Sequence, residues 1–390
     1  MVSIVKRAFL ILTLYVISLC ASQVGKSAVI TLVFPFSARS TSMGEIGVAL
    51  PDNQAAAFYN PAIIAIPNKA WNRGSIGTFY ETLLPEFNIR DLYHTTLSVA
   101  YQPDNEFFGG FSFFFNHISM GENQVVDAFG RTGETKKSYE NVYALTYGFH
   151  FRESGLVHSN FGISTKYIFS AFAPQLDGGQ SAGHAFAIDF GYIYNFENGL
   201  KLGYSSLNMG SNIFYADRSN PEPLPFTMNL AVAFDKQIFF DSILNISLAT
   251  ELRVNREFVY SDSNGNPDPF YKAIFTDVKE DSFKKDINEC ELHWGIELGF
   301  MNTGYFRFGL LLDYTGVRYE SNYGFGVNIL NHFNLDFGRI RSPEGFMKGA
   351  FGNKYGSSGV RDRQTRISFT YISAIRPWND DDLTWWRSKR

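Results

Sequence analysis

The sequence predicts an all-β protein, a transmembrane antiparallel β-barrel of about 14 strands with an N-terminal plug segment. Three observations predict it. Runs in which apolar and polar residues alternate recur along most of the chain. Aromatic residues make up 17% of the chain and charged residues only 18%, which suits a wall that faces lipid. Short connections between the runs alternate with long ones, as periplasmic turns alternate with extracellular loops in such barrels.

The first element is a signal peptide over residues 1–22. Lys6 and Arg7 precede an apolar run that ends in small residues at Cys20 to Ser22, the order typical of a secretory signal. The apolar run is too short to cross a bilayer, which takes roughly 20 residues. Once the signal is removed, Cys290 is the only cysteine, so no intramolecular disulfide is expected. The net charge of −4 gives no sign of nucleic-acid binding.

Residues 23–72 do not alternate, and we expect them to fold into the lumen as a plug or hatch. Asp52 is a good N-cap for a short helix over residues 54–58. Asn60 precedes Pro61 and is therefore pushed toward extended geometry, which ends that helix. Gly44 and Gly47 allow tight backbone turns.

The barrel is expected over residues 73–374. Residues 183–196 illustrate the alternation: one face carries Phe186, Ile188 and Phe190, and the other carries Ala185, Ala187 and Asp189. The expected strands are 74–84, 93–103, 108–120, 138–151, 160–173, 183–196, 199–209, 224–236, 244–259, 290–302, 304–318, 322–330, 332–341 and 365–373. The expected long outer connections are 122–137, 173–182, 209–223, 261–289 and 341–364, and the exception is a short outer loop at 319–321.

Several charged residues fall on the inward face by alternation, and they include both signs. We expect a cross-barrel polar network that pairs its own charges and anchors the plug. Its members are Asp189, Glu251, Arg253, Glu297, Arg307, Asp313, Asp336 and Arg366. Alternation also places His94, His293 and His332 toward the lumen, and His117 and His184 toward lipid.

Residues 38–65, ARSTSMGEIGVALPDNQAAAFYNPAIIA, resemble the N-terminal signature of the PorV/PorQ family. The matching positions are Ala38, Arg39, Met43, Gly44, Gly47, Ala49, Asp52, Ala57, Tyr59, Asn60, Pro61 and Ala62. The resemblance implies a FadL-like fourteen-stranded barrel of the type IX secretion system, and the length and long loops favour the PorV branch. The chain departs from the family in its residues 375–390, which continue past the last strand as a periplasmic tail.

What the resemblance implies for function is protein export without catalysis or a cofactor, in the cell outer membrane of a diderm bacterium. PorV-like barrels act as a shuttle: they receive the C-terminal signal domain of secreted cargo from the large translocon barrel and deliver it to attachment-complex proteins. Outer-membrane lipid would surround the barrel. The alternative is a FadL-like transporter of hydrophobic compounds. A third possibility, an outer-membrane lipid hydrolase, lacks a Gly-x-Ser-x-Gly motif in this sequence.

The longest outer connection is the candidate partner-contact loop. The residues expected to contact a partner are Asp262, Asp268, Phe270, Tyr271, Phe275 and Lys284. Residues 262–268 also place oxygen ligands at alternate positions, as a calcium loop does. Position twelve of that loop is Ala273 rather than the bidentate Glu, so an exposed turn is the better interpretation and no metal is expected.

Overall fold

The structure is a computed structural model of the full chain. It describes residues 27–51, 56–66, 73–84, 89–103, 109–126, 129–130, 132–153, 157–174, 180–215, 221–240, 245–259, 266–279, 290–313, 318–330, 332–341 and 365–374. The expected signal peptide, the tail after residue 374 and the connection over residues 342–364 lie outside these ranges. None of the described helices combines the length and the hydrophobicity that a bilayer-spanning helix needs.

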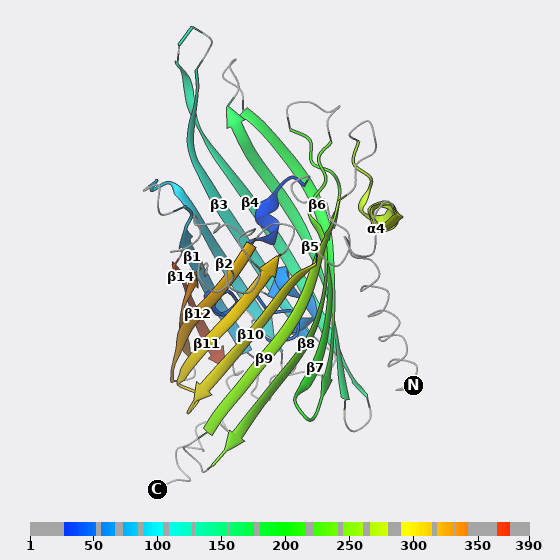
Figure 1. The fold of residues 1–390 in the computed structure, drawn as a ribbon, viewed down its shortest axis with the longest axis vertical. Helices are drawn as coiled ribbons and strands as arrows, with labels where there is room; N and C mark the ends of the chain where they lie inside the picture. The colour runs from blue at the N-terminus through cyan, green and yellow to red at the C-terminus, as the bar shows by residue number, and fades with distance from the viewer. Residues whose placement is uncertain are drawn as a thin grey trace, which may run out of the picture.

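Fourteen antiparallel strands form a closed barrel, because β1 pairs with both β2 and β14 (Figure 1). The strands are β1 (Arg73–Thr82), β2 (Leu92–Gln102), β3 (Gly110–Val126), β4 (Thr132–Glu153), β5 (Val157–Pro174), β6 (Gln180–Phe196), β7 (Leu200–Gly210), β8 (Phe226–Phe239), β9 (Asn245–Phe258), β10 (Glu291–Phe300), β11 (Gly304–Asp313), β12 (Arg318–Ile329), β13 (Phe333–Arg341) and β14 (Thr365–Ala374). The helical elements are η1 (Ile30–Val33), α2 (Ala38–Ser42), α3 (Ala56–Tyr59), η2 (Pro61–Ala65) and α4 (Phe270–Lys279).

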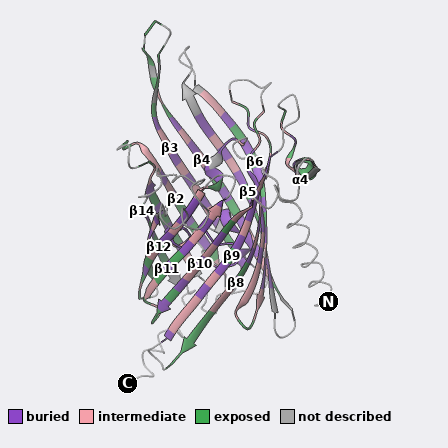
Figure 2. Ribbon diagram, in the orientation of Figure 1, coloured by how far each residue is buried: buried purple, intermediate pink, exposed green. Residues whose placement is uncertain are grey.

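Burial alternates along the strands, as the sequence pattern predicts (Figure 2). On β6, Phe186 and Ile188 are 65% and 47% exposed, whereas Ala187 and Asp189 are buried. The outward residues form an apolar band around the barrel, and the inward residues are small, polar or charged. This two-faced pattern is what a barrel with lipid outside and a filled interior requires.

The predicted closed antiparallel barrel and its strand number are confirmed, and two local expectations are wrong. The connection expected at 122–137 is mostly strand, because β3 and β4 continue as a two-stranded ribbon that rises past the other strands (Figure 1). The short outer loop expected at 319–321 belongs to β12. The long connection expected at 261–289 does lie between β9 and β10, and it contains α4, which the sequence pattern did not predict. A ribbon with solvent on both faces shows no apolar alternation, which explains the first error.

Candidate functional site: the N-terminal segment inside the barrel

Residues 27–51 and 56–66, here called the inner segment, pack against the inward face of the barrel. Helix α2 begins after Ser37, whose side chain accepts a hydrogen bond from the Ser40 N–H. Helix η2 begins after Asn60, whose Oδ1 accepts from the Ala62 N–H at 3.0 Å. The expected helix is observed from Ala56 to Tyr59, and Asp52 lies outside the described residues.

Inward-facing glycines make room for the inner segment around the wall. A Cβ on Gly309 would lie 2.0 Å from the Gly44 nitrogen, and a Cβ on Gly191 would lie 2.0 Å from the Asn60 Oδ1. Atoms cannot approach that closely, so only glycine fits at these positions. The glycines that meet the segment in this way are Gly110, Gly148, Gly162, Gly191, Gly203, Gly295, Gly309, Gly324 and Gly338. We call them the glycine belt.

Much of the glycine belt lies in register across neighbouring strands. Gly148 on β4 stands opposite Gly110 on β3 and opposite Gly162 on β5. Gly162 in turn stands opposite Gly191 on β6. On the other side of the barrel, Gly295 faces Gly309 and Gly324 faces Gly338. The aligned glycines therefore let the inner segment approach the backbone of the barrel strands closely.

The most concentrated anchor is the carboxylate of Glu251 on β9, which is fully buried. It accepts four backbone N–H bonds from consecutive residues of the inner segment. Oε1 accepts from Gly47 at 3.0 Å and Val48 at 2.8 Å, and Oε2 accepts from Ala49 at 3.0 Å and Leu50 at 2.7 Å. A buried charge is tolerated when it is so fully hydrogen-bonded. The Glu251 side chain alone therefore binds all four backbone N–H groups of residues 47–50.

A second anchor is a chain of alternating charges that begins at Arg39. Its guanidinium makes a two-pronged contact with Glu297, at 2.9 and 3.0 Å, and donates to the Pro51 carbonyl at 2.7 Å. Glu297 also pairs with Arg307, which reaches Asp336 at 2.7 Å. The predicted network residue Glu297 therefore contacts the predicted plug residue Arg39 directly, and Arg307 and Asp336 continue the chain along the wall.

Three arginines of the barrel wall, Arg318, Arg253 and Arg366, lie close to Glu45 of the inner segment. Arg318 lies 2.5 Å from its carboxylate, and Arg253 donates to the Glu45 carbonyl at 2.6 Å. Arg366 lies 3.8 Å from Glu45 and donates to the Thr41 hydroxyl at 2.8 Å. Arg366 also pairs with Glu81 on β1. The wall over β9 to β14 therefore holds the inner segment through charge.

The other half of the interior, over β3 to β6, holds an apolar cluster with the buried polar residues Glu140, Lys166 and Asp189 beside it. Phe36 and Phe58 lie 3.9 Å apart between ring centroids, and Phe58 lies 4.4 Å from Phe114 on β3. The same cluster extends to the connection between β7 and β8 through Ile213 and Leu224. Its other members are Ala28, Val29, Leu32, Tyr59, Val142, Ala144, Ile168, Ala185 and Ala187. We call it the apolar flank.

Tyr59 and Asn60 join the two halves. The Asn60 amide nitrogen donates to the carbonyls of Val48 at 2.7 Å and of Tyr204 on β7 at 3.2 Å. Ser205 donates to the Tyr59 carbonyl at 2.7 Å. Met43, another predicted plug residue, is buried in a separate apolar cluster against Ala231, Ala233 and Ala249.

One end of the barrel, here called the outer end, carries the β3–β4 ribbon and α4. There the inner segment contacts the connection between β7 and β8. Ala28 donates to the Pro223 carbonyl at 2.8 Å. The Thr31 hydroxyl and the Ser170 hydroxyl both donate to the Glu140 carboxylate, and Tyr215 donates to Ser170 at 3.1 Å. Burial raises the pKa of Tyr215 to about 12, and the Glu140 carboxylate adds to the shift.

The wall is irregular where β6 meets β7. The register shifts between Ile188 and Phe190, and Asn208 adopts a left-handed conformation with φ of 62°. Asp189 accepts from the Asn208 N–H at 2.7 Å, and Lys166 bridges Asp189 at 2.8 Å and the Asn208 amide oxygen at 2.7 Å. These three buried side chains pin a bulge that lies beside the apolar flank.

Some predicted site residues lie where the sequence placed them, and others lie elsewhere or outside the described residues. All eight predicted network residues are buried, and Asp189 anchors the bulge rather than the inner segment. Asp268 pairs with Lys272 in α4, whereas Asp262 and Lys284 lie outside the described residues. His332, expected to face the lumen, is instead an exposed turn residue. Within the described ranges, no group of acidic, His or Cys side chains could hold a metal ion.

Sequence reasoning missed Glu45, Lys166 and the glycine belt. Glu45 lies inside the recognised motif, so its position was a usable signal. Lys166 faces inward by the same alternation that identified Asp189. The belt glycines were visible as small inward residues, but their alignment depends on cross-strand register, which one sequence does not contain.

No protein-family model matches the chain, and no curated protein matches it. Among solved structures, the chain is similar to the toluene transporter TodX of Pseudomonas putida, with 10% identity over 87% of this chain and 97% of that chain and a TM-score of 0.48. It is also similar to a FadL homologue of Pseudomonas aeruginosa, with 8% identity, 88% and 99% coverage and a TM-score of 0.41. For the outer membrane protein Omp33 of Acinetobacter baumannii, the identity is 6%, the coverage 78% and 99%, and the TM-score 0.37. These likenesses are too distant to place the chain in a family, and the PorV/PorQ assignment stays a prediction.

Proposed function

We propose that this protein is an outer-membrane barrel of a diderm bacterium that transports hydrophobic compounds, with the inner segment as the element that controls passage. The outward apolar band supports the membrane location. The observation that carries the transport proposal is the apolar flank. It runs from Ile213 and Leu224 at the outer loops to Phe36 and Phe58 within the barrel.

The two halves of the interior suit different tasks. The charged half holds the inner segment at Glu251 and Glu297, so that part stays fixed. Contacts within the apolar flank are non-directional and can be exchanged for contacts with an apolar solute at little cost. A hydrophobic compound would therefore move along the apolar flank after a local shift of Phe36 and Phe58, while the anchors keep the lumen closed to water.

The experiment measures uptake of radiolabelled laurate by a Gram-negative host that lacks its own fatty-acid transporter. Cells that express the wild-type barrel are expected to accumulate laurate faster than cells with an empty vector. Phe58→Gln places an amide in the apolar flank and should lower this uptake about tenfold, because an amide beside the path is a poorer contact for an apolar solute than a phenyl ring.

Met43→Gln is the matched control. Met43 is also a buried side chain of the inner segment, 1% exposed against 3% for Phe58, but it packs in the separate cluster beside Glu251. Both substitutions disturb the seating of the segment, and only Phe58→Gln alters the proposed path. Equal losses in the two variants, or no uptake by the wild type, would contradict transport along the apolar flank.

A second candidate function, the PorV-like role in protein export, is favoured by the β3–β4 ribbon. The ribbon projects past the barrel, and beyond Met120 on β3 and Tyr139 on β4 its strands pair only with each other. Such open edges can pair with a strand of another protein. Val126 and Phe129 at its tip are 55% and 86% exposed. The partners would be the large translocon barrel, cargo C-terminal signal domains and attachment-complex proteins.

Purification of the barrel from its native membrane separates the two candidates. Export predicts that a large translocon barrel and secreted cargo co-purify with the wild type and are lost when the ribbon tip, residues 122–137, is replaced by a two-residue turn. Transport predicts a bound fatty acid or hydrocarbon that survives this replacement. Mass spectrometry of the purified sample identifies both kinds of companion.

A further inference from the structure

Helix α4 is fixed to the outer face of the barrel wall, near the outer end (Figure 1). Phe270 of the helix lies 5.9 Å from Phe226 on β8, and Phe226 lies 5.6 Å from Phe258 on β9, between ring centroids. The Arg256 guanidinium lies 4.4 Å above the Phe258 ring. Ile274 packs against the same cluster. The helix therefore covers the outside of β8 and β9 as a fixed element.

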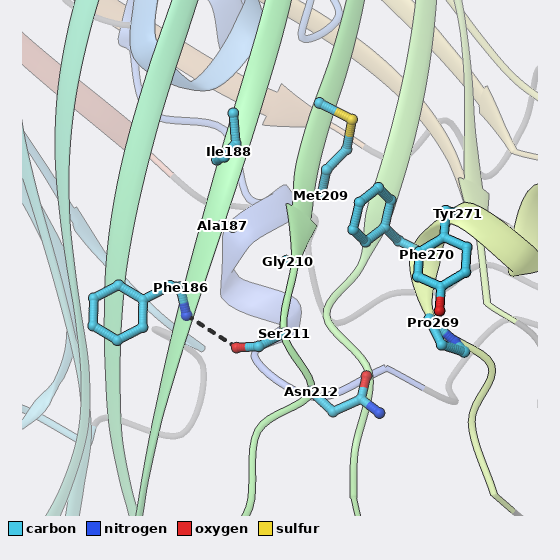
Figure 3. Close-up of a pocket in the computed structure, with 10 residues that line it drawn as sticks. All are labelled: Phe186, Ala187, Ile188, Met209, Gly210, Ser211, Asn212, Pro269, Phe270 and Tyr271. Atoms are coloured by element: carbon cyan, nitrogen blue, oxygen red, sulfur yellow. Dashed lines mark hydrogen bonds between the residues drawn. The ribbon is translucent and has the colours of Figure 1, made fainter.

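Between α4 and the outer face of β6 and β7 lies a pocket of about 590 Å³. This volume falls within the range of roughly 300–1,000 Å³ that small-molecule pockets occupy. Ten residues line the pocket, and Figure 3 shows them: Phe186, Ala187, Ile188, Met209, Gly210, Ser211, Asn212, Pro269, Phe270 and Tyr271.

The lining has an apolar body and a polar end. Ile188 and Met209 lie at one end of the group, and Ser211 and Asn212 lie at the other (Figure 3). The Ser211 hydroxyl accepts from the Phe186 N–H at 3.2 Å, and a hydroxyl that accepts can also donate its own hydrogen to a carbonyl oxygen. A long hydrocarbon chain with a carbonyl at one end matches this division.

The pocket is continuous with the outward apolar band. Phe186 and Ile188, which form its wall on β6, are 65% and 47% exposed and belong to the same face as Phe190. On α4, Tyr271 and Phe275 are 63% and 58% exposed one turn apart, beside the wall. Exposed aromatic residues on an amphipathic helix are typical of the membrane interface. The pocket therefore adjoins the outward apolar band.

We propose that the pocket under α4 binds one acyl chain of an outer-membrane lipid, with the ester group of the lipid at Ser211 and Asn212. The chain would fill the space between the helix and the wall and fix α4 at the membrane surface. The site lies on the outside of the barrel. It requires the membrane location, but it does not require that the barrel transports anything.

The test uses the full-length barrel reconstituted with palmitoyl-oleoyl phosphatidylethanolamine, extracted into mild detergent and examined by native mass spectrometry. The wild type is expected to retain one phospholipid. Ile188→Trp fills the pocket and should lower the fraction of lipid-bearing protein about tenfold.

Ile163→Trp is the matched control. Ile163 faces outward on the adjacent strand β5 and is 45% exposed, but it does not line the pocket. It should retain lipid as the wild type does. The heat-dependent mobility of folded barrels in gels confirms that both variants are folded. Equal lipid retention in the two variants, or no retained phospholipid in the wild type, would overturn the proposal whether or not laurate is transported.

Discussion

Glu251 is a main anchor of the inner segment, because its two carboxylate oxygens accept hydrogen bonds from four backbone N–H groups of that segment. Glu251→Gln keeps the shape but turns one acceptor into a donor that faces two donors. Loss of two bonds to a charged group costs about 3 kcal/mol, or roughly a hundredfold in the opening equilibrium. We expect faster hydrogen–deuterium exchange at the amides of Gly47 to Leu50, measured by mass spectrometry.

The control for this prediction is Glu122→Gln. The Glu122 side chain is 55% exposed and lies 3.7 Å from the exposed Lys137, so the substitution should change neither that exchange nor the fold. Unchanged exchange at residues 47–50 in Glu251→Gln would show that the turn keeps its conformation without the carboxylate.

At the scale of the elements, alternation predicted the strands because each strand has two different environments, one apolar and one polar. The method failed where that difference is absent. The β3–β4 ribbon has solvent on both sides, and α4 adds its apolar side to the outer wall rather than to the interior. Alternation also identified Glu297 and Arg307 as inward residues. It did not predict the bond between Glu297 and Arg39, since that contact joins residues 258 positions apart.

The glycine belt gives a prediction for one element, β11. In Gly309→Val, the Cβ alone would lie 2.0 Å from the backbone of the inner segment, so the segment must move away from the wall. We expect the segment to become sensitive to added protease while the barrel stays folded. Gly304→Val, on the same strand with nothing within 4 Å of the new Cβ, should leave it resistant. Cleavage is followed by N-terminal sequencing. Protection of the segment in Gly309→Val would mean that strand β11 yields instead.

The barrel as a whole explains why an inner segment is needed. Eight strands enclose a space that side chains can fill, and sixteen or more leave a water channel. The fourteen strands here lie between these sizes, and the belt glycines widen the lumen further. The interior is therefore filled by the inner segment, which is held by charged residues on one side and packs in the apolar flank on the other. That asymmetry lets one segment be held firmly by β9 to β14 and yield beside β3 to β6.

Deletion of residues 27–66 tests this account of the whole molecule. The wall then retains Glu251, Glu297, Arg307 and Arg366 without the inner segment, and water should enter the lumen to solvate them. We expect steady ion conductance in planar lipid bilayers, whereas the intact protein should hold the bilayer closed. Replacement of residues 122–137 by a two-residue turn removes chain outside the lumen and should leave conductance at the level of the intact protein. A deletion variant that is folded and does not conduct would mean that the wall itself closes inward, and that the inner segment is not what seals the barrel.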